Sequence, residues 1–192
     1  MVKTPASFKY SIITVLLLIC LSNSIYADQN DPLLNALFNR LHETNSIRHA
    51  KNVEFEIMRI WNLSGNKHID ERMSLSDTAM RESSFKKALT LATSITEERP
   101  KFSEGWNLQA SILFFMGRYD ESLKSVEKTL ALEPRHFGAM IGKGDMLARQ
   151  GRLKAARNAL QRVLILYPLH KRVIQRLEHI DRLIKIRANS YV

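Results

Sequence analysis

The sequence has 192 residues, enough for one globular domain of ordinary size. Apolar residues make up 45% and charged residues 25%, a balance that excludes a disordered or collagen-like chain. Only 7 Gly and 5 Pro interrupt this length, which favours helices over a β-sandwich with many turns. The single cysteine, Cys20, excludes a disulfide framework and a multi-cysteine zinc site. The formal charge is +10, and residues 135–192 carry the excess, with 13 Lys and Arg against 3 acidic residues.

Residues 1–27 have the layout of a secretory signal peptide. Lys3 and Lys9 precede an apolar run from Ile12 to Leu21, and small or polar residues then lead to Ala27. The apolar run is about half of the roughly 20 residues that a membrane-spanning helix needs. We therefore expect cleavage after Ala27 and export to the periplasm or the cell exterior. An uncleaved N-terminal membrane anchor is the alternative.

Residues 28–68 contain two apolar stripes at helical spacing, each preceded by a helix-start signal. Asp31 followed by Pro32 marks the start of the first helix, and Ser46 marks the start of the second. The stripes consist of Leu33, Leu34, Leu37, Phe38 and Leu41, and of Ile47, Ala50, Val53, Ile57, Ile60 and Trp61. We expect an antiparallel helix pair here that forms an N-terminal cap.

Three prolines, Pro100, Pro134 and Pro168, follow one another at intervals of 34 residues. A fixed period of this length indicates a repeat built from two helices. Alignment on the prolines gives three units, residues 69–102, 103–136 and 137–170.

Other positions recur with the same period. Gly117 and Gly151 fall between the two helices of their units, where a positive φ angle ends the first helix, and Ser83 takes this place in the first unit. Small residues recur on both helices, which lets the helices of one unit approach closely. They are Ser76, Ala110 and Gly144 on the first helix, and Ala88, Ser122 and Ala156 on the second.

On these residues the sequence from 69 to 168 resembles the tetratricopeptide repeat family, most closely its small exported bacterial members of unassigned role. The second and third units match the pattern well. The first unit lacks the turn glycine, and Arg72 stands where the second unit has the expected aromatic residue, Trp106. The resemblance implies an all-α fold, a right-handed superhelix of antiparallel helix pairs.

The resemblance also implies a concave groove, lined by the first helix of each unit, that receives a peptide or protein partner. Repeat position assigns this role to Asp77, Arg81, Asn107, Leu108, Ser111, Phe114, Phe115, Ile141, Asp145 and Arg149. For the apolar members, packing against the next helix is the alternative interpretation. The lysine and asparagine clamp that some members use for chaperone tails is absent, because the corresponding positions hold Met73, Asn107 and Ile141, and Asp77, Ser111 and Asp145.

Residues 169–192 complete the array as a C-terminal capping helix and tail. Val173, Leu177, Ile180 and Ile184 fall within a sector about 60° wide at 100° per residue, and the other faces are strongly basic. An exposed end of a repeat array needs such a polar-backed lid.

The sequence contains no motif for a catalytic centre, a metal ion or a cofactor. Its histidines are scattered, and Gly142 and Gly144 lie within a repeat helix without the strand that a nucleotide fingerprint requires. We therefore expect a non-enzymatic protein interaction module or scaffold of the cell envelope. The alternative is a basic surface binder, which would associate with anionic lipid or cell-wall polymer through the C-terminal third. Nucleic acid is not expected as a partner, since no aromatic residues interleave with the basic ones.

Overall fold

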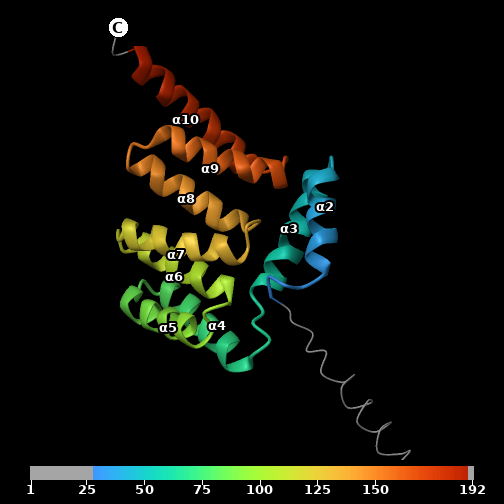
Figure 1. The fold of residues 1–192 in the computed structure, drawn as a ribbon, viewed down its shortest axis with the longest axis vertical. Coiled ribbons are helices and arrows are strands. Elements are labelled where there is room, and N and C mark those ends of the chain that lie inside the picture. Colours follow the sequence, from blue (N-terminus) through green and yellow to red (C-terminus); the bar gives the residue numbers. More distant parts are fainter. Residues whose placement is uncertain (1–27, 190–192) are drawn as a thin grey trace, which may run out of the picture.

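The computed structural model describes residues 28–189, and in this range it contains nine α-helices and no β-strand (Figure 1). The helices are α2 (Leu33–Glu43), α3 (Ile47–Trp61), α4 (Lys67–Arg81), α5 (Phe85–Glu98), α6 (Ser103–Phe115), α7 (Tyr119–Leu132), α8 (Phe137–Arg149), α9 (Leu153–Leu166) and α10 (Lys171–Asn189). The predicted signal peptide, residues 1–27, lies outside the described residues. Within the described range, no helix combines the length and the apolar character required to cross a membrane.

The repeat units form three helical hairpins, α4–α5, α6–α7 and α8–α9, that stack in chain order. Figure 1 shows this stack rising from α4 and α5 to α8 and α9, with α10 packed on α9 at its end. Each hairpin leaves an apolar stripe that only the next hairpin can cover, so the units bury their cores between one another. The predicted all-α solenoid is confirmed.

The turn inside each hairpin has the same geometry in all three units. Ser83, Gly117 and Gly151 have φ angles of 57°, 74° and 72°, so the serine adopts the left-handed conformation that favours glycine. The residue that follows each of them donates a backbone hydrogen bond of 2.8–2.9 Å to the carbonyl five positions earlier. This is the bond of a Schellman motif, which satisfies a carbonyl group at the end of the first helix.

The small residues of the repeat lie where the two helices of a hairpin meet. In the first unit the Ser76 hydroxyl donates to the Ala88 carbonyl at 3.1 Å, and in the second the Ser122 hydroxyl donates to the Ala110 carbonyl at 2.7 Å. In the third unit a Cβ atom added to Gly144 would lie 2.8 Å from the buried Leu160 side chain. The predicted close-contact positions are therefore confirmed.

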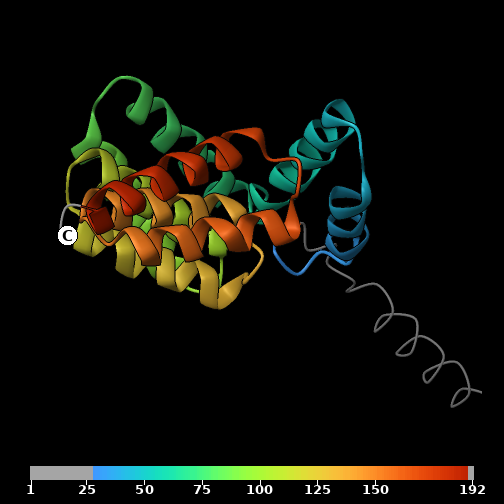
Figure 2. The same cartoon turned by 90° about the horizontal axis from the view of Figure 1, so that it is seen from above.

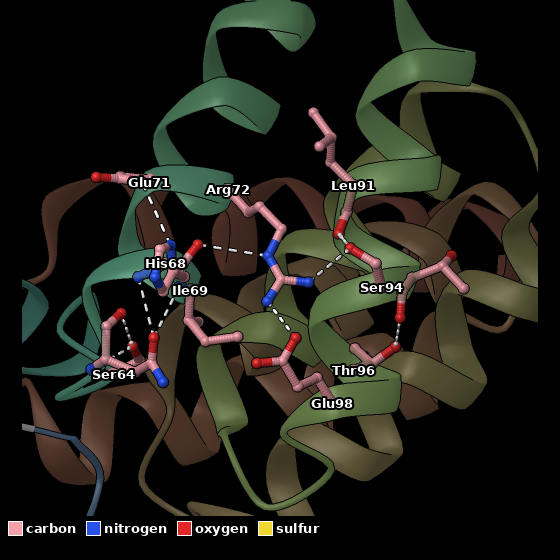
Figure 3. Close-up of polar contacts among 11 residues, drawn as sticks. Ser64, His68, Ile69, Glu71, Arg72, Leu91, Ser94, Thr96 and Glu98 are labelled. Atoms are coloured by element: carbon pink, nitrogen blue, oxygen red, sulfur yellow. Dashed lines mark hydrogen bonds and ion pairs between the residues drawn. The ribbon is translucent and has the colours of Figure 1, made fainter.

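Arg72, at the aromatic position of the degenerate first unit, links the two helices by polar contacts instead (Figure 3). Its guanidinium donates to the Ser94 hydroxyl at 3.2 Å and forms an ion pair with Glu98. Trp106 at the same position of the second unit donates its indole N–H to the Pro100 carbonyl at 2.9 Å. The first unit thus keeps the hairpin geometry without the aromatic residue.

The N-terminal pair forms the predicted helices α2 and α3, but it does not stack on the first unit as a cap. Figures 1 and 2 show the pair beside the stack, along the edge where the connections between units lie. Its apolar stripes belong to the same core as the third unit and α10, except for Leu33 and Ile47. These two residues were predicted to be part of the stripes but are 60% and 52% exposed, because they lie at the first positions of their helices. Gln29, just before α2, accepts from the Ser103 backbone at 3.2 Å, and the Tyr167 hydroxyl donates to Glu54 on α3 at 3.1 Å. The pair and the segment before it thus contact this edge from the first inter-unit connection to the last.

An aromatic cluster explains where the pair docks. Trp61 is 1% exposed, stacks on the His136 ring at 4.2 Å between centroids, and contacts Phe137 at 5.0 Å. Phe38 adds an edge contact to Phe137 at 6.4 Å. Apolar area drives this contact, because aromatic side chains bury more surface than any others.

Buried polar groups also form hydrogen bonds beside this aromatic cluster. The backbone N–H of Ala139 donates to Nδ1 of His136, so the proton of the neutral ring lies on Nε2, which donates to Glu104 at 2.8 Å. Glu133, 2% exposed, accepts from the backbone and guanidinium of Arg135, and Arg135 lies over the Phe38 ring at 4.7 Å. These bonds compensate the cost of burying two carboxylates.

The last helix confirms the predicted lid. Val173, Leu177 and Ile180 are buried against the third unit, and Ile184 packs partly buried beside them. Arg157 on α9 adds an ion pair of 2.6 Å with Asp181.

Candidate functional site

A cleft of about 470 Å³ lies between α6, α8 and the start of α10, and we call it the central cleft. Ala110, Ser122, Val126 and Met146 form its buried floor. Its remaining lining residues are Asn107, Ser111, Phe114, Phe115, Gly138, Ala139, Ile141, Gly142, Asp145, His170, Arg172 and Arg176. The volume is in the range of sites that hold a few side chains of a partner or a small molecule.

Most of the residues assigned to the groove from repeat position meet in the central cleft. They are Asn107, Ser111, Phe114, Phe115, Ile141 and Asp145. They meet because these positions lie on the first helices of the second and third units, which stack side by side with the same face inward. The repeat register thus brings six of the ten assigned residues to one cleft.

The assignment of Leu108 to the groove is wrong. Its side chain is 7% exposed and packs in the core with Ile69, Met73 and Ile112. One position along a helix rotates the side chain by about 100°, so Leu108 points into the stack while its neighbour Asn107 faces the cleft. The alternative interpretation, packing against the neighbouring helix, is the correct one for this residue.

Three other assigned residues are exposed but do not line the central cleft. Asp77 and Arg81 lie on α4, and Arg81 donates to the Thr78 hydroxyl at 2.9 Å. Arg149 lies on α8, with its guanidinium 5.2 Å from the centre of the Phe114 ring. They extend the groove surface beyond the cleft rather than forming it.

Phe115 is the most exposed apolar side chain of the central cleft, at 62%. Its ring stacks on Phe85 at 6.2 Å, with an angle of 3° between the rings, and meets Phe114 edge-on at 5.8 Å. Phe114 also contacts Tyr119 at 5.6 Å. The neighbouring rings hold Phe115 in place, so little side-chain entropy remains to be lost when a partner covers it.

Cationic groups surround the α10 side of the cleft. Arg176 forms an ion pair of 3.2 Å with Asp145, and Arg172 is exposed one turn earlier on α10. Burial raises the pKa of the Asp145 carboxyl, while Arg176 and Arg149 act in the opposite direction. The cleft lining on this side thus has two guanidinium groups, of Arg172 and Arg176, against one carboxylate, which leaves it basic.

At the α4 end of the groove the charge differs. Burial raises the pKa of the Asp77 carboxyl, Arg81 opposes this shift, and Glu104 reinforces it. The α4 end thus presents the carboxylate of Asp77 and the guanidinium of Arg81 together, whereas Arg172 and Arg176 give the α10 side of the cleft an excess of cations.

Sequence reasoning missed Arg172 and Arg176 as cleft residues, although the signal was present. They follow Gly138 and Gly142 by 34 residues, so they continue the groove-facing positions of the repeat into α10. Extending the register by one helix would have found them.

Between residues 28 and 189, no group of three or more His, Cys, Asp or Glu side chains could hold a metal ion. His170 is buried at the cleft wall, and burial lowers the pKa of its imidazole, so the ring is neutral at pH 7. Its Nδ1 accepts the Val173 N–H at 3.4 Å, which makes it a cap of α10.

Comparison with known proteins points to one family. The model of the tetratricopeptide repeat family matches residues 107–170. A TPR repeat-containing protein of Rhizobium etli is 33% identical over 135 residues, which cover 70% of this chain and 66% of that protein, just under two thirds of its length.

Solved structures with a similar fold come from several proteins. The TPR domain of Sgt2 from Aspergillus fumigatus has a TM-score of 0.61 at 17% identity, covering 65% of this chain and 83% of that one. The first TPR of Spaghetti (RPAP3), bound to the HSP90 peptide SRMEEVD, has a TM-score of 0.59 at 16% identity, covering 61% of this chain and 93% of that one. The TPR domain of P58(IPK) has a TM-score of 0.59 at 15% identity and covers 95% of this chain and 53% of that one. At these identities the likeness concerns the fold.

Proposed function

Because the chain belongs to the tetratricopeptide repeat family, we propose that it is a non-enzymatic interaction module whose central cleft binds a peptide segment of a partner protein. One observation carries this proposal: an exposed, ring-supported Phe115 stands in a cleft whose α10 side is basic. This combination suits a segment with an apolar side chain followed by carboxylates.

The chemistry of one similar structure is compatible with this. The first TPR of Spaghetti (RPAP3) is bound to a peptide, SRMEEVD, that combines a methionine and a valine with acidic residues. The cationic groups proposed for the same task here are Arg172 and Arg176, and Asp145 beside them would disfavour a purely acidic ligand. We propose the mixed apolar and acidic class without assigning that particular peptide.

The proposal is tested by selecting peptides from a random display library on the immobilised protein and measuring the affinity of the enriched sequences. We expect enrichment of an apolar residue next to Asp or Glu. Phe115→Ala should weaken binding by about tenfold, which corresponds to the free energy gained when roughly half of a phenylalanine side chain is buried. Arg172→Glu should also weaken binding, and the loss of affinity should be larger at low salt than at high salt.

Leu75→Ala is the matched control for this experiment, because Leu75 is 53% exposed on α4 and does not line the central cleft. It should leave the affinity unchanged. Equal affinities for the wild type and both cleft variants, or a library without enrichment, would refute the proposal.

For the cellular location, we propose export to the periplasm or cell exterior, with removal of residues 1–27. The layout of Lys3, Lys9 and the apolar run from Ile12 to Leu21 supports this. The mass of the protein isolated from cells tests it, since a chain beginning at Asp28 indicates cleavage and a full-length chain in the membrane fraction indicates an anchor.

The alternative role, binding to anionic polymer or lipid through residues 135–192, has weaker support. Several basic side chains of this region are paired with carboxylates: Arg135 with Glu133, Lys143 with Glu127, Arg157 with Asp181, and Arg176 with Asp145. Such pairing lowers the attraction that this region can exert on an anionic surface.

A further inference from the structure

One helix face outside the groove combines exposed apolar and basic side chains without any acidic residue. It consists of Ile47, Arg48, Lys51, Phe55, Met58 and Arg59, and we call it the α3 outer face. At 100° per residue these positions fall within a sector about 120° wide. The opposite sector of α3, with Ala50, Val53, Ile57 and Trp61, is buried in the core.

The apolar members of the α3 outer face are unusually accessible. Phe55 is 69% exposed, Ile47 is 52% exposed and Met58 is 45% exposed. Phe55 is the most exposed large hydrophobic side chain among residues 28–189. Single exposed apolar residues are ordinary, but three of them on one face of one helix indicate a surface that contacts something.

The charge of the face selects among possible contacts. Arg48, Lys51 and Arg59 are exposed, and none of them forms an ion pair with a described residue. The two glutamates of α3 are engaged elsewhere, Glu54 by the Tyr167 hydroxyl and Glu56 by Arg40 at 3.5 Å. The face therefore presents three cations and three apolar side chains with no carboxylate among them.

We propose that the α3 outer face docks on the surface of a bilayer that contains anionic phospholipid. Side chains such as Phe55 and Met58 would enter the boundary between headgroups and acyl chains, and the three cations would contact lipid phosphates. Figures 1 and 2 show α2 and α3 at the edge of the stack, and the exposure of Ile47, Phe55 and Met58 shows that the stacked helices do not cover the α3 outer face. The central cleft lies on other helices, so membrane docking and peptide binding use separate surfaces.

A site-specific probe tests this in the full chain. In a Cys20→Ser background, Met58→Cys gives a single thiol for a polarity-sensitive fluorophore, and Leu75→Cys on α4 gives a matched control with an exposed apolar parent residue. Vesicles of phosphatidylglycerol and phosphatidylcholine are compared with pure phosphatidylcholine, with and without brominated acyl chains. We expect a blue shift and bromine quenching at position 58 on the anionic vesicles, and neither at position 75.

Charge-reversal variants provide a second test of the proposed contact with lipid. Arg48→Glu with Arg59→Glu should weaken the response at position 58 by more than about twentyfold, since each basic residue near an anionic surface contributes about fivefold. Lys86→Glu with Lys87→Glu, two exposed residues on α5, should not change it. Attachment through residues 1–27 alone would give the same signal at positions 58 and 75. That result would overturn the proposal, as would a signal that ignores lipid charge or an absence of any signal.

Discussion

Two glycines on α8 should respond to alanine in opposite directions, although they lie two positions apart. A Cβ atom on Gly144 would lie 2.8 Å from Cγ and Cδ2 of Leu160, a side chain that is fully buried. Overpacking of this kind typically costs about 1–3 kcal/mol. A Cβ atom on Gly142 meets no atom within 4 Å, so alanine there should stabilise the helix by about 0.5–1 kcal/mol.

Urea unfolding followed by circular dichroism measures both free energies of unfolding. We expect the midpoint to fall for Gly144→Ala and to rise for Gly142→Ala, with unchanged dependence on urea concentration. Leu160→Ala supplies the coupling test, because removing the clashing atoms should make the double variant with Gly144→Ala more stable than the sum of the single effects predicts. Similar effects at both glycines, or simple additivity with Leu160→Ala, would refute the close approach of α8 and α9.

The remaining predictions concern the turns, the docked pair and a buried histidine. Ser83→Gly should raise the free energy of unfolding by about 0.5–1 kcal/mol, because it removes a left-handed serine at a modest entropic cost; a lower urea midpoint would contradict this. Trp61→Ala should lower the free energy of unfolding by about 3–5 kcal/mol and make the connection between α3 and α4 sensitive to limited proteolysis. A protease-resistant variant would show that the aromatic cluster does not hold the α2–α3 pair in place. Burial lowers the pKa of His170 in the folded state, so the unfolded chain binds the proton first and stability falls as the pH drops below about 6.5. His170→Asn keeps a helix-capping side chain and should reduce this loss of stability at low pH, as measured by urea unfolding at several pH values. An unchanged pH dependence of the free energy of unfolding would show that other groups cause the loss.

The periodicity of the sequence was sufficient to predict the stack of hairpins. The 34-residue spacing of Pro100, Pro134 and Pro168 sets where each unit ends, and the residue at the turn must tolerate a positive φ angle. These are local constraints, which a sequence expresses directly. Cleft residues such as Asn107 and Phe115 followed from the same register.

The position of the N-terminal pair could not be predicted in this way. The stripes of α2 and α3 show that each helix buries one face, but they do not specify the surface against which it packs. The partner surface, around His136 and Phe137, lies far along the chain and has no periodic relation to the pair. The assignment of Leu108 to the groove was wrong for a related reason, since repeat position defines a helix face only to within about one residue.

The most direct test of a peptide-binding cleft is methyl NMR of the protein during titration with a peptide selected by the display experiment. Ile141 and Met146 line the central cleft, whereas Ile47 and Met58 lie on the α3 outer face. We expect the methyl signals of Ile141 and Met146 to shift in proportion to saturation while those of Ile47 and Met58 stay in place. Shifts confined to the α3 methyl groups, or none at saturating peptide, would contradict the account.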